Sequence, residues 1–312
     1  MSTAWGVDEM PDQSGRTVVV TGANSGLGFE ATKLFARNGA DVVMACRNRE
    51  RAQTARNDIR AVVNKPSLSV IELDLADLSS VRSFVETFKE NHDELHILCN
   101  NAGLMAIPRQ ETVDGFEMQF GVNHLGHFAL TGLLLDRLRE SSGETRVVTQ
   151  SSGLHENGAM DFDDLHGKRE YDKWDAYGQS KLANLLFAYE LDRRLDDAGA
   201  DVTSVGCHPG YADTDLQRRG PEMMGSRLRL FLVQVANKLV AQSAQQGALP
   251  MLYAATASDI AGGEYIGPGG LMDMRGPPAK QASSELSTDE ELAARLWEES
   301  TEATDVSFGL AN

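Results

Sequence analysis

Short apolar runs alternate with amphipathic segments along most of the chain. The runs are rich in β-branched residues and end at polar residues or glycine, a pattern typical of buried strands. The segments between them carry apolar residues at helical spacing, as at Leu27, Ala31 and Phe35. Strands are therefore expected at 17–21, 41–46, 68–73, 95–99, 146–150, 201–207 and 264–268.

This alternation predicts an α/β fold. The strands are apolar throughout and are separated by helices, so they favour a parallel sheet covered on both faces, with right-handed crossovers. The expected helices cover 27–35, 50–62, 78–88, 113–138, 177–191, 228–240 and 243–257, and a last one contains Leu292, Leu296 and Trp297 behind a capping box at Ser287-Thr-Asp-Glu290.

No repeat or linker divides the sequence. We expect one domain over 1–312, with an N-terminal extension at 1–15, a loop over the substrate site at 208–242 and a tail with a helix at 276–312. The apolar stretch at 228–240 could form a lid over an apolar substrate, or a packed or subunit-contacting helix.

The segment after the first strand is rich in glycine and reads Thr21-Gly-Ala-Asn-Ser-Gly-Leu-Gly28. Glycines permit a tight turn and a close backbone approach, and the N-terminus of the next helix offers unpaired N–H groups to a phosphate. The spacing Gly-x-x-x-Gly-x-Gly differs from the usual Gly-x-Gly-x-x-Gly, and glycine is common in such turns. The turn is a candidate phosphate cradle whose interpretation depends on its context.

Arg47 follows the second strand at the position where proteins that prefer NAD usually carry an acid for the ribose hydroxyl. An arginine there can pair with a 2′-phosphate, so Arg47 favours NADP over NAD. The alternative is a solvated arginine at the end of a strand.

Other polar residues follow later strands at the same predicted edge of the sheet, where open α/β sheets bind ligands. Asp74 could meet an adenine amino group or cap the next turn. The remaining candidates are Leu75, Asn100, Asn101, Ala102 and Gly103, then Ser152, and finally His208, Pro209, Gly210 and Thr214.

Tyr177 and Lys181 stand four residues apart and share one helical face. A nearby ammonium favours the ionised phenol, which brings tyrosine closer to use as an acid or base at neutral pH. The pattern Tyr-x-x-x-Lys is common, so only its place after Ser152 and the glycine cradle gives it weight.

Asn123 is the unusual residue of the helix expected at 113–138, since its neighbours are apolar or small. His124 and His127 lie close by in sequence. No carboxylate or cysteine accompanies them, so ordinary packing is favoured over a metal site.

The composition narrows the class of protein. With 29 basic and 46 acidic residues among 312, the formal net charge is −17, which excludes nucleic acid as an expected partner. This acidic excess suits a cytoplasm rich in salt; the alternative is that it only forms a solvated surface. Residues 1–16 lack a targeting pattern and no apolar stretch is long enough to span a membrane, so we expect a soluble, cytoplasmic protein. Cys46, Cys99 and Cys207 are expected to be buried free thiols.

Together the motifs resemble the short-chain dehydrogenase/reductase family, in family order over nearly the whole chain. They are Thr21-Gly22-x-x-x-Gly26-x-Gly28, Asn100-Asn-Ala-Gly103, Asn123, Ser152, Tyr177-x-x-x-Lys181 and Pro209-Gly210. Three further segments resemble the branch of retinol dehydrogenases, WW-domain oxidoreductases and protochlorophyllide reductases: Ala45-Cys-Arg-Asn48, Gly121-Val-Asn-His-Leu-Gly-His-Phe128 and Glu264-Tyr-Ile-Gly267. The resemblance implies a Rossmann-type sheet of about seven strands in the order 3-2-1-4-5-6-7.

The resemblance also implies roles. Tyr177 would exchange a proton with the substrate oxygen, Ser152 would hold that oxygen, and Lys181 would bind the ribose and lower the tyrosine pKa. Asn123 would anchor a proton relay. The cofactor would contact Gly22, Asn24, Ser25, Gly26, Leu27, Gly28, Arg47, Asp74, Leu75, Asn101, Ala102, Gly103, Tyr177, Lys181, Pro209, Gly210 and Thr214.

The expected function is that of an NADP(H)-dependent oxidoreductase that transfers a hydride to or from a carbonyl or alcohol of an apolar small molecule. NAD(H) is the less favoured cofactor, and relatives are often homodimers or homotetramers. Three alternatives stay open: a ketosteroid or 3-oxoacyl reductase of the same fold, a non-catalytic NADP sensor, and a methyltransferase. A methyltransferase would have no use for Ser152, Tyr177 and Lys181 together.

Overall fold

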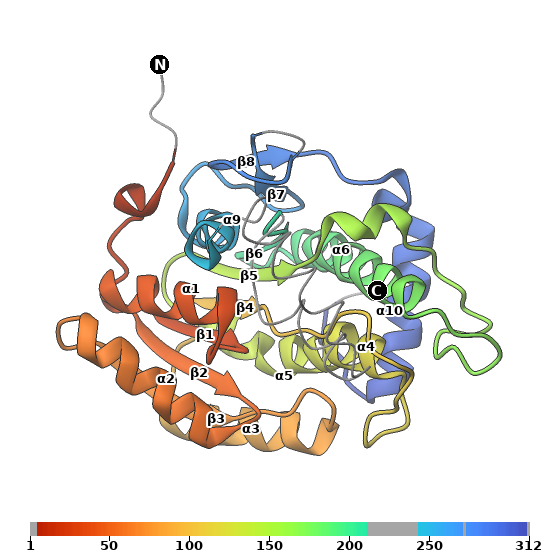
Figure 1. The fold of residues 1–312 in the computed structure, drawn as a ribbon, viewed down its shortest axis with the longest axis horizontal. Helices are drawn as coiled ribbons and strands as arrows, with labels where there is room; N and C mark the ends of the chain where they lie inside the picture. The colour runs from red at the N-terminus through yellow and green to blue at the C-terminus, as the bar shows by residue number, and fades with distance from the viewer. Residues whose placement is uncertain (1–4, 211–242, 271–272, 311–312) are drawn as a thin grey trace, which may run out of the picture.

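A computed structural model describes residues 5–210, 243–270 and 273–310, and places helices on both faces of one central sheet (Figure 1). The eight strands follow the order β3-β2-β1-β4-β5-β6-β7-β8. This confirms the α/β class and the expected strand order. The strands are β1 Thr17–Thr21, β2 Asp41–Cys46, β3 Ser67–Glu72, β4 Ile97–Asn100, β5 Thr145–Gln150, β6 Val202–Cys207, β7 Tyr265–Pro268 and β8 Pro278–Gln281.

The first seven strands are parallel, and β8 pairs antiparallel with β7 at the edge. The sequence pattern did not predict β8. Its four residues include Pro278 and the charged Lys280, and an edge strand tolerates both because its outer side makes no ladder bonds.

Alternate residues of each strand enter opposite cores. Val18 and Val20 face the helices α1 Gly26–Arg37, α2 Arg49–Val62 and α9 Ala244–Thr256, whereas Val19 faces α3 Leu78–Asn91, α5 Gly126–Glu140 and α6 Lys173–Asp197. This two-residue period on a sheet covered on both faces explains why the strands are apolar at every position.

Helix α10, Glu290–Thr304, lies outside this arrangement and packs against α6 and α5. Its N-cap is Asp289, whose side chain accepts from the Leu292 N–H. The capping box expected to start at Ser287 is therefore wrong. Ser287 is buried in the preceding 3₁₀ turn Glu285–Thr288, where its hydroxyl contacts Ser283 and Ser284.

The helix expected at 113–138 begins later and is interrupted. Residues 111–117 form a turn in which Thr112 and Phe116 pair through their backbones and Gly115 has φ +85°. The Asp114-Gly115 pair favours this turn over a helix. The helical part is α4 Met118–Phe120, a π-helical turn at Gly121–Leu125, and then α5.

Helix α6 begins at Lys173, four residues before Tyr177, because Asp172 caps it by accepting from the Trp174 and Asp175 N–H groups. Tyr177 and Lys181 thus lie within the helix and not at its frayed first turn. The helix expected at 228–240, Thr214 and most of the loop at 208–242 lie outside the described residues. Among the helices described, none has the length and apolar character to cross a membrane.

Candidate active site

The glycine turn forms one wall of a cavity at the carboxyl end of the sheet. Gly22 and Gly26 have φ +67° and +55°, which favour glycine. A Cβ at Gly28 would lie 2.5 Å from the Gly22 carbonyl oxygen and 2.6 Å from Asn101 Nδ2, so no side chain fits there. The Ser25 side chain does not cap α1, which leaves the first N–H groups of this helix available to a ligand.

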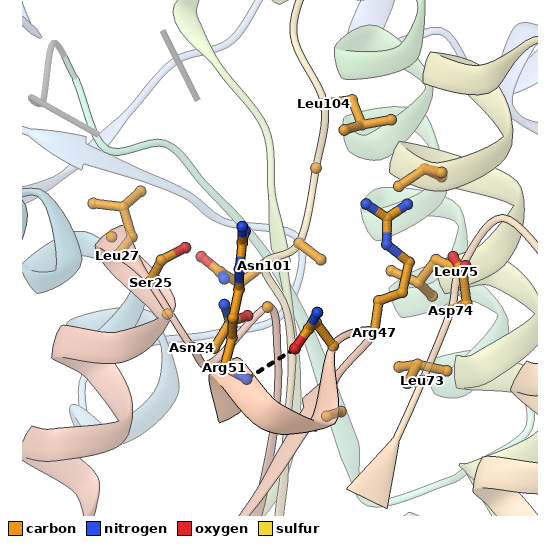
Figure 2. A pocket seen from close by; sticks show the side chains of 18 residues that line it. Asn24, Ser25, Leu27, Arg47, Arg51, Leu73, Asp74, Leu75, Asn101 and Leu104 are labelled. Carbon is orange, nitrogen blue, oxygen red and sulfur yellow. Dashed lines mark hydrogen bonds between the residues drawn. The ribbon is translucent and has the colours of Figure 1, made fainter. Parts of the chain in front are cut away.

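The cavity brings together most of the residues expected to bind a cofactor (Figure 2). Segments from β1, β2, β3 and β4 contribute, each just past its strand. The expected residues that line it are Gly22, Asn24, Ser25, Gly26, Leu27, Gly28, Arg47, Asp74, Leu75, Asn101, Ala102 and Gly103. The lining residues that the sequence analysis did not single out are Ala45, Asn48, Arg51, Leu73, Leu104 and Val122.

Arg51 is the most informative of these additional residues. It stands four residues after Arg47, and both arginines line the cavity (Figure 2). Asn48 caps α2 by accepting from the Arg51 N–H at 2.8 Å, which fixes the start of the helix. Within the described part of the chain, neither guanidinium is paired with a carboxylate. The run Arg47-Asn-Arg-Glu-Arg51 was the available clue.

Asp74 lines the cavity and also organises the turn behind it. Its Oδ1 accepts from the Ala76 N–H at 3.0 Å, whereas the cap of α3 is Asp77. The interpretation as a turn cap is therefore confirmed, and the contact with an adenine amino group stays a prediction.

Ser152, Tyr177 and Lys181 meet beyond β5. Ser152 caps the 3₁₀ turn Gly153–Asn157, and its side chain lies close enough to Tyr177 to act on the pKa of that phenol. The Lys181 ammonium lies 5.8 Å from the centre of the Tyr177 ring and donates to the Gln150 carbonyl at 3.0 Å. The three side chains expected to act together therefore do lie together. Tyr177 and Lys181 are both buried.

Burial shifts both titrating groups of this cluster. It raises the pKa of Tyr177 to about 12, although the contact with Ser152 acts in the opposite direction. Burial also lowers the pKa of Lys181 to about 8. The net pKa of Tyr177 in this arrangement is therefore raised and not lowered as expected, because the cost of burying a phenolate dominates.

Asn123 connects this cluster to the cavity. Its Oδ1 accepts from the Leu104 N–H at 2.7 Å, and its Nδ2 donates to the Leu104 carbonyl and to Ser180 Oγ at 3.0 and 2.9 Å. A Cβ on Gly103 would lie 3.1 Å from Asn123 Oδ1 and 3.6 Å from Lys181 Nζ. The loop that lines the cavity therefore rests directly on Asn123 and Lys181.

Pro209 and Gly210 follow β6 and lie outside the lining of the cavity. Gly210 has φ +63°, and its N–H donates to His208 Nδ1 at 3.3 Å. A side chain there would collide with the Met274 carbonyl. Gly210 thus lets the chain leave the sheet edge close to the segment before β8.

Among residues 5–210, 243–270 and 273–310, no group of three His, Cys, Asp or Glu side chains could hold a metal ion. His124 and His127 are buried and lie among packed side chains and hydrogen-bonding partners. The three cysteines are buried and free, as predicted.

Comparison with known proteins gives a consistent result. The family model described as short chain dehydrogenase matches residues 16–225. The chain is 43% identical to retinol dehydrogenase 13 of Homo sapiens, over 92% of this chain and 83% of the relative. It is 41% identical to polyprenol dehydrogenase of Mus musculus, over 96% and 87%. The crystal structure of an uncharacterized protein from Mycobacterium Paratuberculosis matches 99% of this chain and 100% of that chain, with 40% identity and a TM-score of 0.81.

Proposed function

Because this chain belongs to the short-chain dehydrogenase family, whose members use NAD(P)(H), we propose that it is an NADP(H)-preferring oxidoreductase of apolar alcohols and their carbonyl counterparts. The observation that carries the cofactor preference is that Arg47 and Arg51 line one cavity and that neither is paired with a carboxylate of the described residues. Their charge and geometry suit a 2′-phosphate, and the uncapped start of α1 suits the pyrophosphate.

The residues of this chain then have separate tasks. When bound, the nicotinamide supplies or accepts the hydride. Tyr177 is protonated at neutral pH, since its pKa is raised to about 12, and can donate that proton to a carbonyl oxygen during reduction. Ser152, whose side chain lies near Tyr177, would hold the same oxygen by a hydrogen bond. Lys181, beside the tyrosine ring, supplies the positive charge that stabilises a phenolate after the proton has left.

The relatives support an apolar substrate, since two of them are named for retinol and polyprenol, both long apolar alcohols. Profiling with retinoid, polyprenoid, ketosteroid and 3-oxoacyl substrates tests this class. We expect turnover with the first two. Turnover confined to ketosteroids or 3-oxoacyl compounds would reassign the substrate and leave the reaction type unchanged.

Cofactor preference is tested by fluorescence titration with NADPH and NADH. We expect NADPH to bind the wild-type protein at least about tenfold more tightly, or roughly 1.4 kcal/mol. Arg47→Ala and Arg51→Ala should each reduce this margin, and the double variant should abolish it. Arg49→Ala is the matched control, because Arg49 lies on the same segment outside the cavity lining. Equal affinities for both nucleotides in the wild type would refute the preference.

The acid–base role is tested by Tyr177→Phe. We expect turnover to fall by about a thousandfold while the dissociation constant of NADPH stays within about twofold, because the hydroxyl acts on the reacting oxygen. Tyr189→Phe is the control, since Tyr189 lies on the same helix and bonds Ser283 instead. Substantial turnover by Tyr177→Phe would overturn the role.

A further inference from the structure

His127 is a buried polar residue with no task in the proposed mechanism. It lies in the first turn of α5, directly after the π-helical turn that carries Asn123, and is 1% exposed. Its two ring nitrogens have different partners. Nδ1 lies 3.0 Å from the backbone carbonyl oxygen of Asn123, and Nε2 lies 2.9 Å from Thr21 Oγ1.

These partners determine the form of the ring. A carbonyl oxygen can only accept, so Nδ1 carries the proton. Burial, helped by the nearby Lys181 ammonium, lowers the pKa of His127 to about 4, although the bond to the Asn123 carbonyl acts in the opposite direction, so the ring is neutral near pH 7. A neutral ring has one acceptor, Nε2, and the Thr21 hydroxyl donates to it. The alternative acceptor for this hydroxyl, the Cys99 carbonyl, is farther away at 3.3 Å.

On one side of His127, Thr21 bonds to residues that line the cofactor cavity. Thr21 Oγ1 accepts the N–H groups of Asn101 and Ala102, both at 2.9 Å. The backbone carbonyl oxygen of Thr21 accepts from Asn101 Nδ2 at 2.7 Å. Asn101 and Ala102 line the cavity, so the orientation of one hydroxyl determines how this stretch of the lining is held.

The Asn123 end reaches the acid–base cluster. Asn123 fixes Leu104 through two hydrogen bonds and bonds Ser180, the residue before Lys181. His127 therefore lies between two structures that have to be aligned for hydride and proton transfer. One holds the nucleotide and the other holds the proton-transfer groups.

We propose that His127 is a positioning residue that aligns the cofactor loop with the acid–base cluster, by donating from Nδ1 to the Asn123 carbonyl and accepting at Nε2 from Thr21. This inference rests on the proposed function for its catalytic meaning. The two hydrogen bonds from His127 to two separate segments can be tested in the protein without substrate or cofactor.

Two substitutions separate the bonds. The amide of His127→Asn can occupy the place of Nδ1 and keep the bond to Asn123, while the bond to Thr21 is lost. The amide of His127→Gln can occupy the place of Nε2 and accept from Thr21, while the bond to Asn123 is lost. Both side chains are neutral, so the field at Lys181 does not change. The distinction between the variants is therefore one of position and not of charge.

We expect opposite kinetic results. His127→Asn should weaken NADPH binding about fivefold with turnover at saturating cofactor nearly unchanged. His127→Gln should leave NADPH binding within about twofold but lower turnover about tenfold. Thr21→Val removes the bond to His127 together with the two bonds that Thr21 Oγ1 accepts from Asn101 and Ala102, so it should weaken NADPH binding at least as much as His127→Asn. Adding His127→Asn to Thr21→Val should have little further effect, because the bond between the two side chains is already lost. Ser300→Ala removes the buried bond to His124 and controls for a loss of stability. It should change neither NADPH binding nor turnover.

Backbone amide signals of the isotope-labelled free protein give the second readout. The Asn101 and Ala102 signals should shift in His127→Asn and Thr21→Val, and the Leu104 signal should shift in His127→Gln. If both His127 variants disturb both sets of signals, or neither set, His127 only fills space and the proposal is wrong. If the wild-type protein binds no nucleotide, the proposed function fails, while these signals still decide whether His127 holds the two segments.

Discussion

Three titratable residues, the buried Tyr177 and Lys181 and the half-buried Asp192, show how one physical cause has different consequences at different sites. Burial raises the pKa of Tyr177 and Asp192 and lowers that of Lys181, because in each case it disfavours the charged form. Tyr177 and Lys181 lie at the candidate active site, where such shifts serve proton transfer. Asp192 lies on α6 away from that site, and its shift is a cost to stability.

Asp192→Asn should stabilise the protein at neutral pH. Burial, together with the neighbouring Asp196, raises the pKa of Asp192 to about 6, although the bond from the Ser204 N–H acts against this. The folded protein therefore binds a proton more tightly here than the unfolded chain does. The ionised carboxylate lowers stability above pH 6, and this penalty disappears as the pH falls toward 4. Asparagine keeps the acceptor for Ser204 without the charge.

The measurement is the free energy of unfolding by denaturant between pH 4 and pH 8. We expect Asp192→Asn to gain about 1 to 3 kcal/mol at pH 7 to 8 and to lose this advantage near pH 4. Asp163→Asn, which neutralises an exposed carboxylate in the loop before α6, controls for the change in net charge. An advantage that does not depend on pH would show that the charge of Asp192 is not its source.

The sequence predicted those site residues that lie at the ends of strands. The glycines of the cradle, Arg47 and the polar ends of the strands could be found because sheet topology alone brings them to one edge. The direction of the Tyr177 shift could not be found, because it depends on burial by residues distant in sequence. The bond between His127 and Thr21 was missed for the same reason, since Thr21 lies 106 residues away.

Most helices and strands were predictable at the scale of the element, because sheet and helix faces impose clear periods. The errors lie where a short-range interaction outweighs the period. The turn at Asp114-Gly115 delays the helix before Asn123, and the Asp172 cap starts α6 early. Strand β8 is too short and too polar to stand out, and exists through its pairing with β7.

The chain after α10 depends on a different kind of contact. Asp305 has φ +51° and ends the helix, and Arg82 of α3 donates to the Thr304 and Asp305 carbonyls. The chain then returns so that the Phe308 ring lies 4.5 Å from that of Trp297 and 4.8 Å from that of Phe128. These contacts hold residues 305–308 against α5 and α10.

Phe308→Ala should therefore destabilise the protein by about 3 kcal/mol, because it removes a buried ring from an aromatic cluster. Thermal unfolding and denaturant titration measure the loss. Gly132→Ala should have a similar effect, since a Cβ there would lie 2.7 Å from both Phe308 and Val306. In the double variant the second substitution should cost less, because the Phe308 ring is gone and only the close contact with Val306 remains. Simple additivity would show that Gly132 does not accommodate Phe308.

At the scale of the whole molecule, charge is the dominant feature. The formal net charge is −17, so the folded surface carries a large excess of carboxylates that repel one another. The described ion pairs that involve Lys33, Lys89 and Arg169 are partly solvated and contribute little each. Screening should weaken the repulsion more than it weakens these few attractions, since the repulsion acts over longer distances.

We therefore predict that KCl raises the melting temperature. Most of the rise should occur by about 0.5 M, where the Debye length has fallen to a few ångströms, if screening of repulsion is the cause. A rise that continues in proportion to salt up to several molar would instead indicate strengthened burial of apolar surface. Repeating the titration near the pH at which the net charge vanishes separates the two, because screening then has no net repulsion to remove. A melting temperature that stays flat or falls at neutral pH would mean that the acidic excess is only a solvated surface, without a role in adapting the protein to salt.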